Sequence, residues 1–407
     1  MRGGFKFGGR SLSMGLLLIY TFSLMFWDYL IESKIAAGLL IVVGLIILKG
    51  RFRFKGMAYI WAYALFTLFF VFHTVLGFSR DAVASWNALS TMGLNLVIAI
   101  SCIGLMSRDR KFLEKYMKGF VWCAFLVCCY NLIIKHADLF NGQLTINCPK
   151  LFSSEVYSHN DVPGYAVIAL FFLVYFLGSK LISSRIAISG ILFFTIFILL
   201  SGARKALIGA LIAVLIYPYI FMTKKHSSGQ KIFRIGAAIL LLIVVYIIMI
   251  KNDFLYNLIG YKFEDVFQGL ISGEFEESSS ISRNRMIVGG IALIKQKPFI
   301  GYGLRAWSSW IGLSGSWSHN MIIELTFSGG LFAPIIYYSF YIPFFKGLKK
   351  ETSHDYLGSM LFCYMLFMVI HELLSVSYLA RSVSLMYCII TVYLNMCRES
   401  TCNEQIT

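Results

Sequence analysis

The chain has 407 residues, of which 58% are apolar and 14% are charged, and its formal net charge is +16. This composition excludes an ordinary water-soluble protein, and the continuous apolar runs predict membrane-spanning helices because lipid leaves no other partner for backbone groups. The positive charge does not predict nucleic-acid binding, because the basic residues are scattered among short loops instead of gathered on one face. Such loops favour anionic lipid headgroups.

Twelve apolar runs predict an all-α integral membrane protein with about 12 transmembrane helices. The first run lacks the small-residue cleavage site of a signal peptide and is interpreted as a span. The second run is short, and residues 186–222 also permit one long hairpin. The predicted spans are 11–30, 35–48, 56–78, 87–107, 117–135, 162–183, 186–202, 204–223, 232–250, 320–345, 356–375 and 377–397.

The distribution of lysine and arginine orients these spans. If the N-terminus is cytoplasmic, the inside segments hold 22 of the 36 basic residues, and the short outside loops are nearly free of them. This places both termini inside. It divides the chain into spans one to nine over 1–251, one large extracytoplasmic loop subdomain over 252–318, and the last three spans with a cytoplasmic tail over 319–407.

The extracytoplasmic loop is the one long polar segment of the sequence. Arg283 and Arg285 open an apolar stretch that ends near Lys297, which predicts a short interfacial helix from Arg285 to Lys297. Pro298-Phe-Ile-Gly301-Tyr-Gly303 then predicts a turn. One of the two arginines, with Arg283 favoured, is interpreted as a phosphate ligand because both should lie at the membrane surface.

Arg204 and Lys205 form a second basic pair on the predicted outer side, against the general trend. They permit two interpretations. In the first, the pair extends to lipid headgroups at a helix boundary. In the second, it provides fixed cations for a lipid-linked phosphate, whose oxygens an arginine binds with two parallel hydrogen bonds. Ser201 and Gly202, just before the pair, offer a hydroxyl and close backbone approach.

Ser318-His319-Asn320 closes the loop at the start of the tenth predicted span. A histidine accepts a proton at neutral pH, which activation of a sugar hydroxyl requires. A structural donor at the helix start is the competing interpretation. Ser318 and Asn320 are both suitable N-caps, and Glu324, in the apolar run that follows, needs a partner.

Three further polar groups lie near the outer surface. His159-Asn160-Asp161 either binds sugar hydroxyls or caps the sixth span, and both interpretations stay open. His371-Glu372 and Tyr378 to Arg381 are interpreted as structural His–Glu or Glu–Arg pairs. The nine cysteines show no metal-binding spacing, so we expect no metal site, no disulfide framework and no cofactor.

Four of these segments together resemble the bacterial O-antigen ligase and polysaccharide polymerase superfamily of membrane glycosyltransferases. They are Ser201-Gly-Ala-Arg204-Lys205, Ser282-Arg283 followed by the Pro-x-x-Gly-x-Gly turn, Ser318-His319-Asn320 with Gly330, and His159-Asn160-Asp161. Ala333 departs from a second glycine of the family, and the first spans match only in hydropathy.

The resemblance implies a GT-C-like membrane-embedded fold that acts without a metal on undecaprenyl-diphosphate-linked oligosaccharide. It implies that His319 is the base for the acceptor hydroxyl. The expected diphosphate ligands are Arg204, Arg283, Lys205 and Arg285. The expected sugar or acceptor ligands are His159, Asn160, Asp161, Asn320 and Arg305.

The predicted function is polymerisation of lipid-linked repeat units into O-antigen or capsular-type polysaccharide at the outer face of the bacterial cytoplasmic membrane. One alternative is ligation of finished polymer to lipid A core. A second is a non-enzymatic transporter or flippase, which more often carries polar residues at mid-membrane. A chain-length regulator and a flippase are the protein partners that fit the predicted reaction.

Overall fold

The computed structural model describes residues 6–28, 30–48, 56–140, 144–145, 147–158, 160–218, 228–272, 278–309, 317–352 and 355–404. Within these residues every regular element is a helix, and one isolated bridge joins Pro149 to Val156. An all-helical architecture is what the continuous apolar runs predict, because a helix satisfies its backbone hydrogen bonds within one segment.

The α-helices follow one another as α1 (Lys6–Trp27), α2 (Ile31–Leu48), α3 (Ala58–Val75), α4 (Ala82–Met106), α5 (Arg110–Ile134), α6 (Asp161–Gly178), α7 (Ser184–Ser201), α8 (Arg204–Leu211), α10 (Ser228–Lys251), α11 (Asp253–Leu255), α12 (Tyr261–Ser272), α13 (Ser278–Gln296), α14 (Met321–Gly329), α15 (Phe332–Tyr338), α16 (Tyr341–Glu351), α17 (Tyr356–Leu373) and α18 (Arg381–Glu404). Five-residue π-helical turns follow α8 and α11, at Ile212–Ile216 and Tyr256–Gly260.

Seven of the described helices are long and apolar enough to cross a membrane. They are α1, from Arg10 onward, and α3, α4, α5, α6, α7 and α17. Each coincides with one of the predicted spans, so the chain is a multi-pass membrane protein. The count of twelve stays a prediction.

The predicted span 320–345 is wrong as a single helix. This segment forms three short helices, α14, α15 and α16, with a break between the first two at Gly330. Gly330 adopts a φ of 65°, and its Cα faces the backbone of Phe299 with no room for a side chain. A positive φ, which glycine adopts without steric cost, ends α14 at this residue, so the segment is interrupted and is not one continuous helix. The interfacial helix predicted from Arg285 begins earlier, at Ser278.

Helix α6 lies at the centre of the bundle. Of its residues 78% are buried, against 28% in α7, and it packs on α5, α7, α8 and α17. Helix α7 exposes a row of aliphatic side chains, Ile186, Ile188, Leu192 and Ile196. An aliphatic surface of this kind suits contact with lipid tails.

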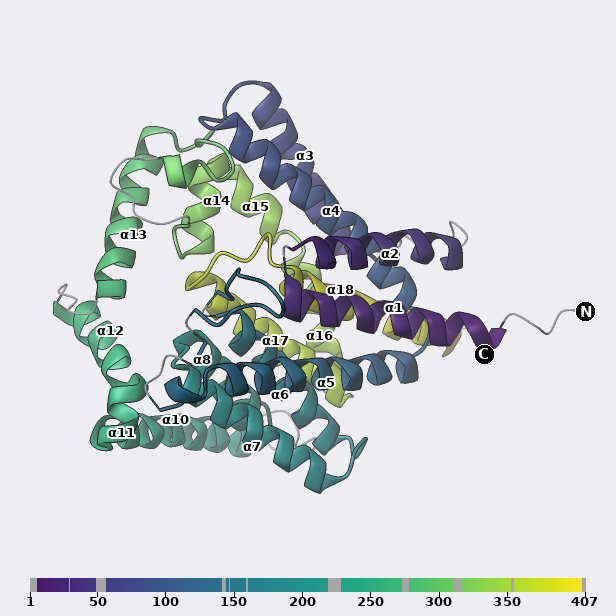
Figure 1. The fold of residues 1–407 in the computed structure, drawn as a ribbon, viewed down its shortest axis with the longest axis vertical. Coiled ribbons are helices and arrows are strands. Elements are labelled where there is room, and N and C mark those ends of the chain that lie inside the picture. Colours follow the sequence, from purple (N-terminus) through teal and green to yellow (C-terminus); the bar gives the residue numbers. More distant parts are fainter. Residues whose placement is uncertain are drawn as a thin grey trace, which may run out of the picture.

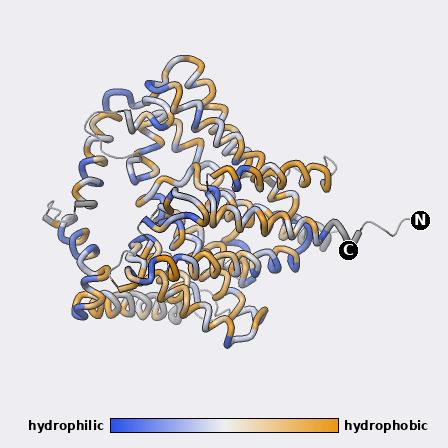
Figure 2. Tube along the Cα trace, viewed as in Figure 1, coloured by the Kyte–Doolittle hydropathy of each residue, from blue (hydrophilic) through white to orange (hydrophobic). Residues whose placement is uncertain are grey.

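The polar segment lies at one end of the bundle. Helices α12 and α13 form an arch at this end, while the start of α1 and the end of α18 lie at the opposite end (Figure 1). The arch carries more hydrophilic residues than the bundle helices beside it (Figure 2). The placement of 252–318 on the other side of the membrane from the termini stays a prediction.

Candidate active site

The turn between α7 and α8 positions Arg204 and Lys205 at the start of α8. Gly202 ends α7 with a φ of 64°, a conformation that glycine adopts without steric cost. The Ser201 hydroxyl donates to the Ile198 carbonyl at 2.7 Å and accepts from the Ala203 amide at 3.3 Å. The serine hydroxyl therefore holds the turn, and Arg204 is the first residue of α8.

Lys205 is a buried lysine at the start of α8. Its residue exposure is 7%. It makes no hydrogen bond to any residue that the structure describes, and its charge interacts with Arg283, Arg204 and Asp161. Two of these three neighbours are also positive. Because a buried charge is costly without a counterion, this arrangement favours binding of an anion.

Arg204 is tied to the arch. Its Nη1 donates to the Lys262 carbonyl at 3.0 Å and to the Ser280 hydroxyl at 3.5 Å. Lys262 lies in α12, and Ser280 is a buried residue of α13. Arg204 therefore joins the bundle to the arch formed by α12 and α13.

Arg283 and Arg285, the two arginines that the sequence leaves as alternative phosphate ligands, lie close together near the start of α13 but differ in their exposure. Residues two apart on a helix point in different directions, and Arg283 is half-buried while Arg285 is exposed. The charge of Arg283 interacts with both Lys205 and His319. Arg283 thus joins Arg204 and Lys205 in one group of basic side chains, the cation cluster, whereas Arg285 is exposed.

His319 lies in a tight turn before α14, with a φ of 57°. This left-handed conformation costs a residue with a Cβ about 1–2 kcal/mol. The Ser318 amide donates to the Glu324 carboxylate at 2.9 Å. Asn320 is the N-cap of α14, and its side-chain oxygen accepts from the Ile323 amide at 3.1 Å. These contacts hold His319 in place and supply the partner that Glu324 needs.

The imidazole of His319 is neutral at physiological pH. Burial, followed by the charges of Arg283 and Lys205, lowers the pKa of His319 to about 4. A neutral imidazole can accept a proton, so the electrostatics of the cluster keep this side chain in the form that a general base requires.

His371 joins this cluster from the last turn of α17. Its Nδ1 is buried and has no hydrogen-bond partner among the described residues, and its ring packs on Phe367 with centroids 5.6 Å apart. Its charge state is coupled to that of Lys205. The sequence shows only a histidine near the end of an apolar run, which is too weak a signal to place it here.

The predicted His371–Glu372 pair is wrong. Glu372 instead accepts hydrogen bonds from the Ser377 hydroxyl at 2.6 Å, the Tyr341 hydroxyl at 2.7 Å and the Tyr387 hydroxyl at 3.2 Å. These donors satisfy the buried Glu372 carboxylate, so Glu372 does not serve as the hydrogen-bond partner of His371.

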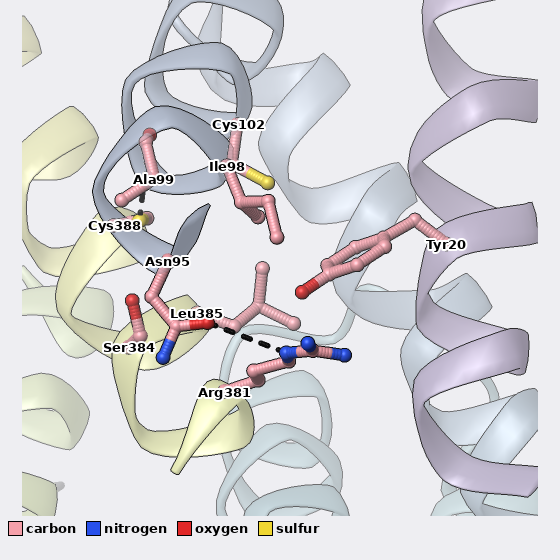
Figure 3. Close-up of a pocket in the computed structure, with 9 residues that line it drawn as sticks. All are labelled: Tyr20, Asn95, Ile98, Ala99, Cys102, Arg381, Ser384, Leu385 and Cys388. Atoms are coloured by element: carbon pink, nitrogen blue, oxygen red, sulfur yellow. Dashed lines mark hydrogen bonds between the residues drawn. The ribbon is translucent and has the colours of Figure 1, made fainter. Parts of the chain in front are cut away.

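Arg381 is also a structural residue, but with partners that the sequence does not predict. Its guanidinium donates to the Asn95 side chain at 3.3 Å and to the Ser33 hydroxyl at 3.2 Å, and lies 3.6 Å from the Asp28 carboxylate. Arg381 and Asn95, joined by this hydrogen bond, line a small cavity together with Tyr20 (Figure 3). This network fastens the start of α18 to α4 and to the first two helices.

The first residue of α6, Asp161, contributes one carboxylate. Asp161 accepts from the Ser158 amide at 2.9 Å, and its charge interacts with Lys205. Asn160 is the N-cap residue of α6 but makes no side-chain capping bond. His159 lies outside the described residues.

Arg305 lies behind the His319 turn. Its guanidinium stacks over the Trp317 ring at 5.1 Å from the centroid, and its charge interacts with Glu324. Arg305 therefore supports the carboxylate that holds the turn.

The Pro-x-x-Gly-x-Gly segment packs backbone against backbone on the end of α14. The Tyr302 amide donates to the Phe327 carbonyl at 2.9 Å, and the Gly303 amide to the Ser328 carbonyl at 2.7 Å. A Cβ at Gly301 would meet the Gly329 amide nitrogen at 2.7 Å. Glycine is required because this approach leaves no space for a side chain.

The fold and the cluster define a class of protein: a multi-pass helical membrane protein with one buried lysine, two half-buried arginines and two histidines at one end of its bundle. Residues 188–338 match the protein family described as O-Antigen ligase. This match supports the resemblance to the O-antigen ligase and polysaccharide polymerase superfamily that the sequence motifs indicate. The matched segment includes Arg204, Lys205, Arg283 and His319. A search of the curated proteins finds no match.

Proposed function

We propose that the protein is a metal-independent glycosyltransferase that joins undecaprenyl-diphosphate-linked oligosaccharides into a polysaccharide at the outer face of the bacterial cytoplasmic membrane. The observation that carries this proposal is the buried Lys205, which makes no hydrogen bond to the described residues and has two arginines near it. A diphosphate supplies the negative charge that this cluster needs.

The cluster would bind the leaving group of the reaction. The acceptor hydroxyl oxygen forms a bond to the anomeric carbon of the donor sugar, and the bond from that carbon to the diphosphate oxygen breaks. The electron pair leaves with the diphosphate, whose added negative charge Arg283, Lys205 and Arg204 stabilise. Fixed cations in a site that excludes water are effective at this task.

His319 would remove the proton of the acceptor hydroxyl. Its neutral imidazole lies within the field of the same two cations that bind the leaving group. In this proposal the nucleophile and the leaving group occupy adjacent parts of one site. Asn320 beside it and Asp161 near Lys205 are suited to bind sugar hydroxyls.

A matched pair of variants tests this function. In proteoliposomes that contain lipid-linked oligosaccharide, Arg283→Ala should abolish polymer formation while Arg285→Ala, two residues away and exposed, should keep it. Arg283→Lys should restore activity only in part, because lysine lacks the planar fork of arginine. Normal polymer formation by Arg283→Ala would contradict the proposed site.

Ligation is the alternative within the same chemistry. The two reactions use the same donor and differ in the acceptor, which is a second lipid-linked oligosaccharide for a polymerase and lipid A core for a ligase. Supplying the purified protein with each acceptor in turn separates them. We favour polymerisation, and product on lipid A core alone would overturn that choice.

A further inference from the structure

A second cationic site lies away from the cluster, in a cleft of about 560 Å³. One wall is the loop between α3 and α4, which includes Ser79 and Arg80. The other is the chain that follows α13, which includes Lys297 and Tyr302. None of the described residues that line the cleft is acidic.

The two walls of the cleft are fastened to each other. The Arg80 amide donates to the Tyr302 carbonyl at 2.8 Å, and the Ser85 hydroxyl donates to the Leu304 carbonyl at 2.9 Å. The His73 Nε2 lies 2.8 Å from the Ile300 carbonyl oxygen. These bonds join segments more than 200 residues apart, so the cleft is a preformed feature of the fold.

The residues of the cleft suit the headgroup of an anionic lipid. Arg80 and Lys297 are exposed, and the Lys297 ammonium lies over the Tyr302 ring, 5.0 Å from its centroid. Large apolar side chains lie next to these cations, with Phe78 43% exposed and Phe299 62% exposed. Basic groups beside exposed aromatic rings are typical of a membrane interface.

Helix α13 separates the cleft from the cation cluster. Arg283 lies in its second turn and the cleft begins at its last residue, Gln296, so the two lie about 20 Å apart along the axis at 1.5 Å per residue. Helix α14 runs beside it, since a Cβ at Gly290 would meet Ile323. One diphosphate cannot reach both places, so the cleft is a separate site.

The chemistry of polymerisation requires a second diphosphate. The acceptor oligosaccharide is bonded to its own lipid diphosphate through one end and offers a hydroxyl from another sugar. That hydroxyl must reach His319, just before α14, while the acceptor's diphosphate stays at the membrane surface.

We propose that the Arg80–Lys297 cleft binds the diphosphate of the acceptor lipid and that the acceptor oligosaccharide extends beside α13 and α14 towards His319. This proposal rests on the polymerase function proposed above. A phosphate on an ordinary phospholipid shares the same chemistry, so the test must distinguish the two lipids.

Two substrate analogues separate donor from acceptor. An oligosaccharide on a lipid phosphonate that cannot leave acts only as acceptor, and a lipid-linked oligosaccharide with its terminal hydroxyl methylated acts only as donor. For the double variant Arg80→Gln/Lys297→Gln we expect the acceptor KM to rise tenfold or more, with the donor KM unchanged. The control Lys251→Gln/Lys295→Gln removes two exposed charges outside the cleft and should change neither KM.

Binding provides a readout that is independent of catalysis. In phosphatidylcholine nanodiscs, native mass spectrometry should count two undecaprenyl diphosphates on the wild type and one on either Arg80→Gln/Lys297→Gln or Arg283→Gln. Binding of only one undecaprenyl diphosphate to the wild type would overturn the proposal. Loss of the second undecaprenyl diphosphate when equimolar phosphatidylglycerol is added would also overturn it. Failure of the proposed polymerase function would give a different result: the wild-type protein would not transfer the oligosaccharide of the donor-only analogue to the acceptor-only analogue.

Discussion

The side-chain amide of Asn320 donates to the Leu373 carbonyl at 3.0 Å, which joins the start of α14 to the end of α17. Each of these helix ends carries a histidine, His319 before α14 and His371 in the last turn of α17. The electrostatic environment of both includes Lys205. One hydrogen bond thereby holds together the two helix ends that carry these histidines, although 52 positions separate the histidines in the sequence.

Replacement of Lys205 by methionine should separate binding from stability. We expect Lys205→Met to weaken donor binding at least tenfold. Its melting temperature should not fall, because removing a buried cation also removes a desolvation cost and a repulsion. Thermal unfolding in detergent and donor binding, measured on the same sample, provide the test.

Arg204→Met is the control for Lys205→Met. Its Nη1 hydrogen bonds to α12 and α13 should make its loss destabilising, by about 1.5–3 kcal/mol for hydrogen bonds from a charged donor. A Lys205→Met protein that loses stability as much as Arg204→Met would show that Lys205 is structural.

The pH dependence should differ between the free and the donor-bound protein. The pKa of His319, lowered to about 4 in the free protein, keeps the imidazole unprotonated above that pH, so kcat/KM should fall only as the pH drops towards about 4. Bound diphosphate offsets Arg283 and Lys205 and should raise this pKa, so the acid limb of kcat should lie at higher pH. An acid limb near pH 6.5 in both profiles would mean that His319 is not under the influence of these cations.

His371 should affect the reaction without supporting the fold. Because its buried Nδ1 has no described partner, His371→Ala should reduce kcat about tenfold or more and leave protein levels unchanged, while His371→Gln should recover part of the loss by offering a hydrogen-bonding group. His73→Ala provides the contrast, since His73 contacts the Ile300 carbonyl and its loss should lower protein levels. Wild-type kcat in His371→Ala would exclude a role in the site.

Topology can be tested by labelling single cysteines in a cysteine-free background. Cysteines at Ser279, in α13, and at Lys349, in α16, should react with a membrane-impermeant reagent from opposite sides. Reaction of both from the same side would contradict the placement of the arch outside the membrane.

The sequence predicts the long membrane-spanning helices of this protein but not the break within 320–345, and the difference has a physical reason. Long apolar runs identify α3 to α7 and α17 because crossing a bilayer needs both length and hydrophobicity. The broken segment 320–345 escapes this rule, since its break depends on Gly330 meeting the backbone of Phe299, a contact distant in the sequence. Hydropathy alone cannot reveal such a contact.

The site follows the same pattern. Arg204, Lys205, Arg283 and His319 stand out because polar residues interrupt apolar runs, and the structure brings them together. His371 and the Arg80–Lys297 cleft do not stand out, because their proximity arises only from the packing of α17, α13 and the α3–α4 loop. The exposure that separates Arg283 from Arg285 likewise depends on how α13 lies against the bundle.

The proton acceptor is the central claim, and His319→Asn tests it most directly. Asparagine adopts the left-handed conformation at this position more readily than most residues, so the turn should be kept while the base is removed. We expect single-turnover glycosyl transfer to fall about 10²–10⁴-fold in His319→Asn and equally in His319→Ala, with donor binding unchanged in both. Activity retained by His319→Asn but lost by His319→Ala would contradict the account, because the residue would then hold the turn and not the proton.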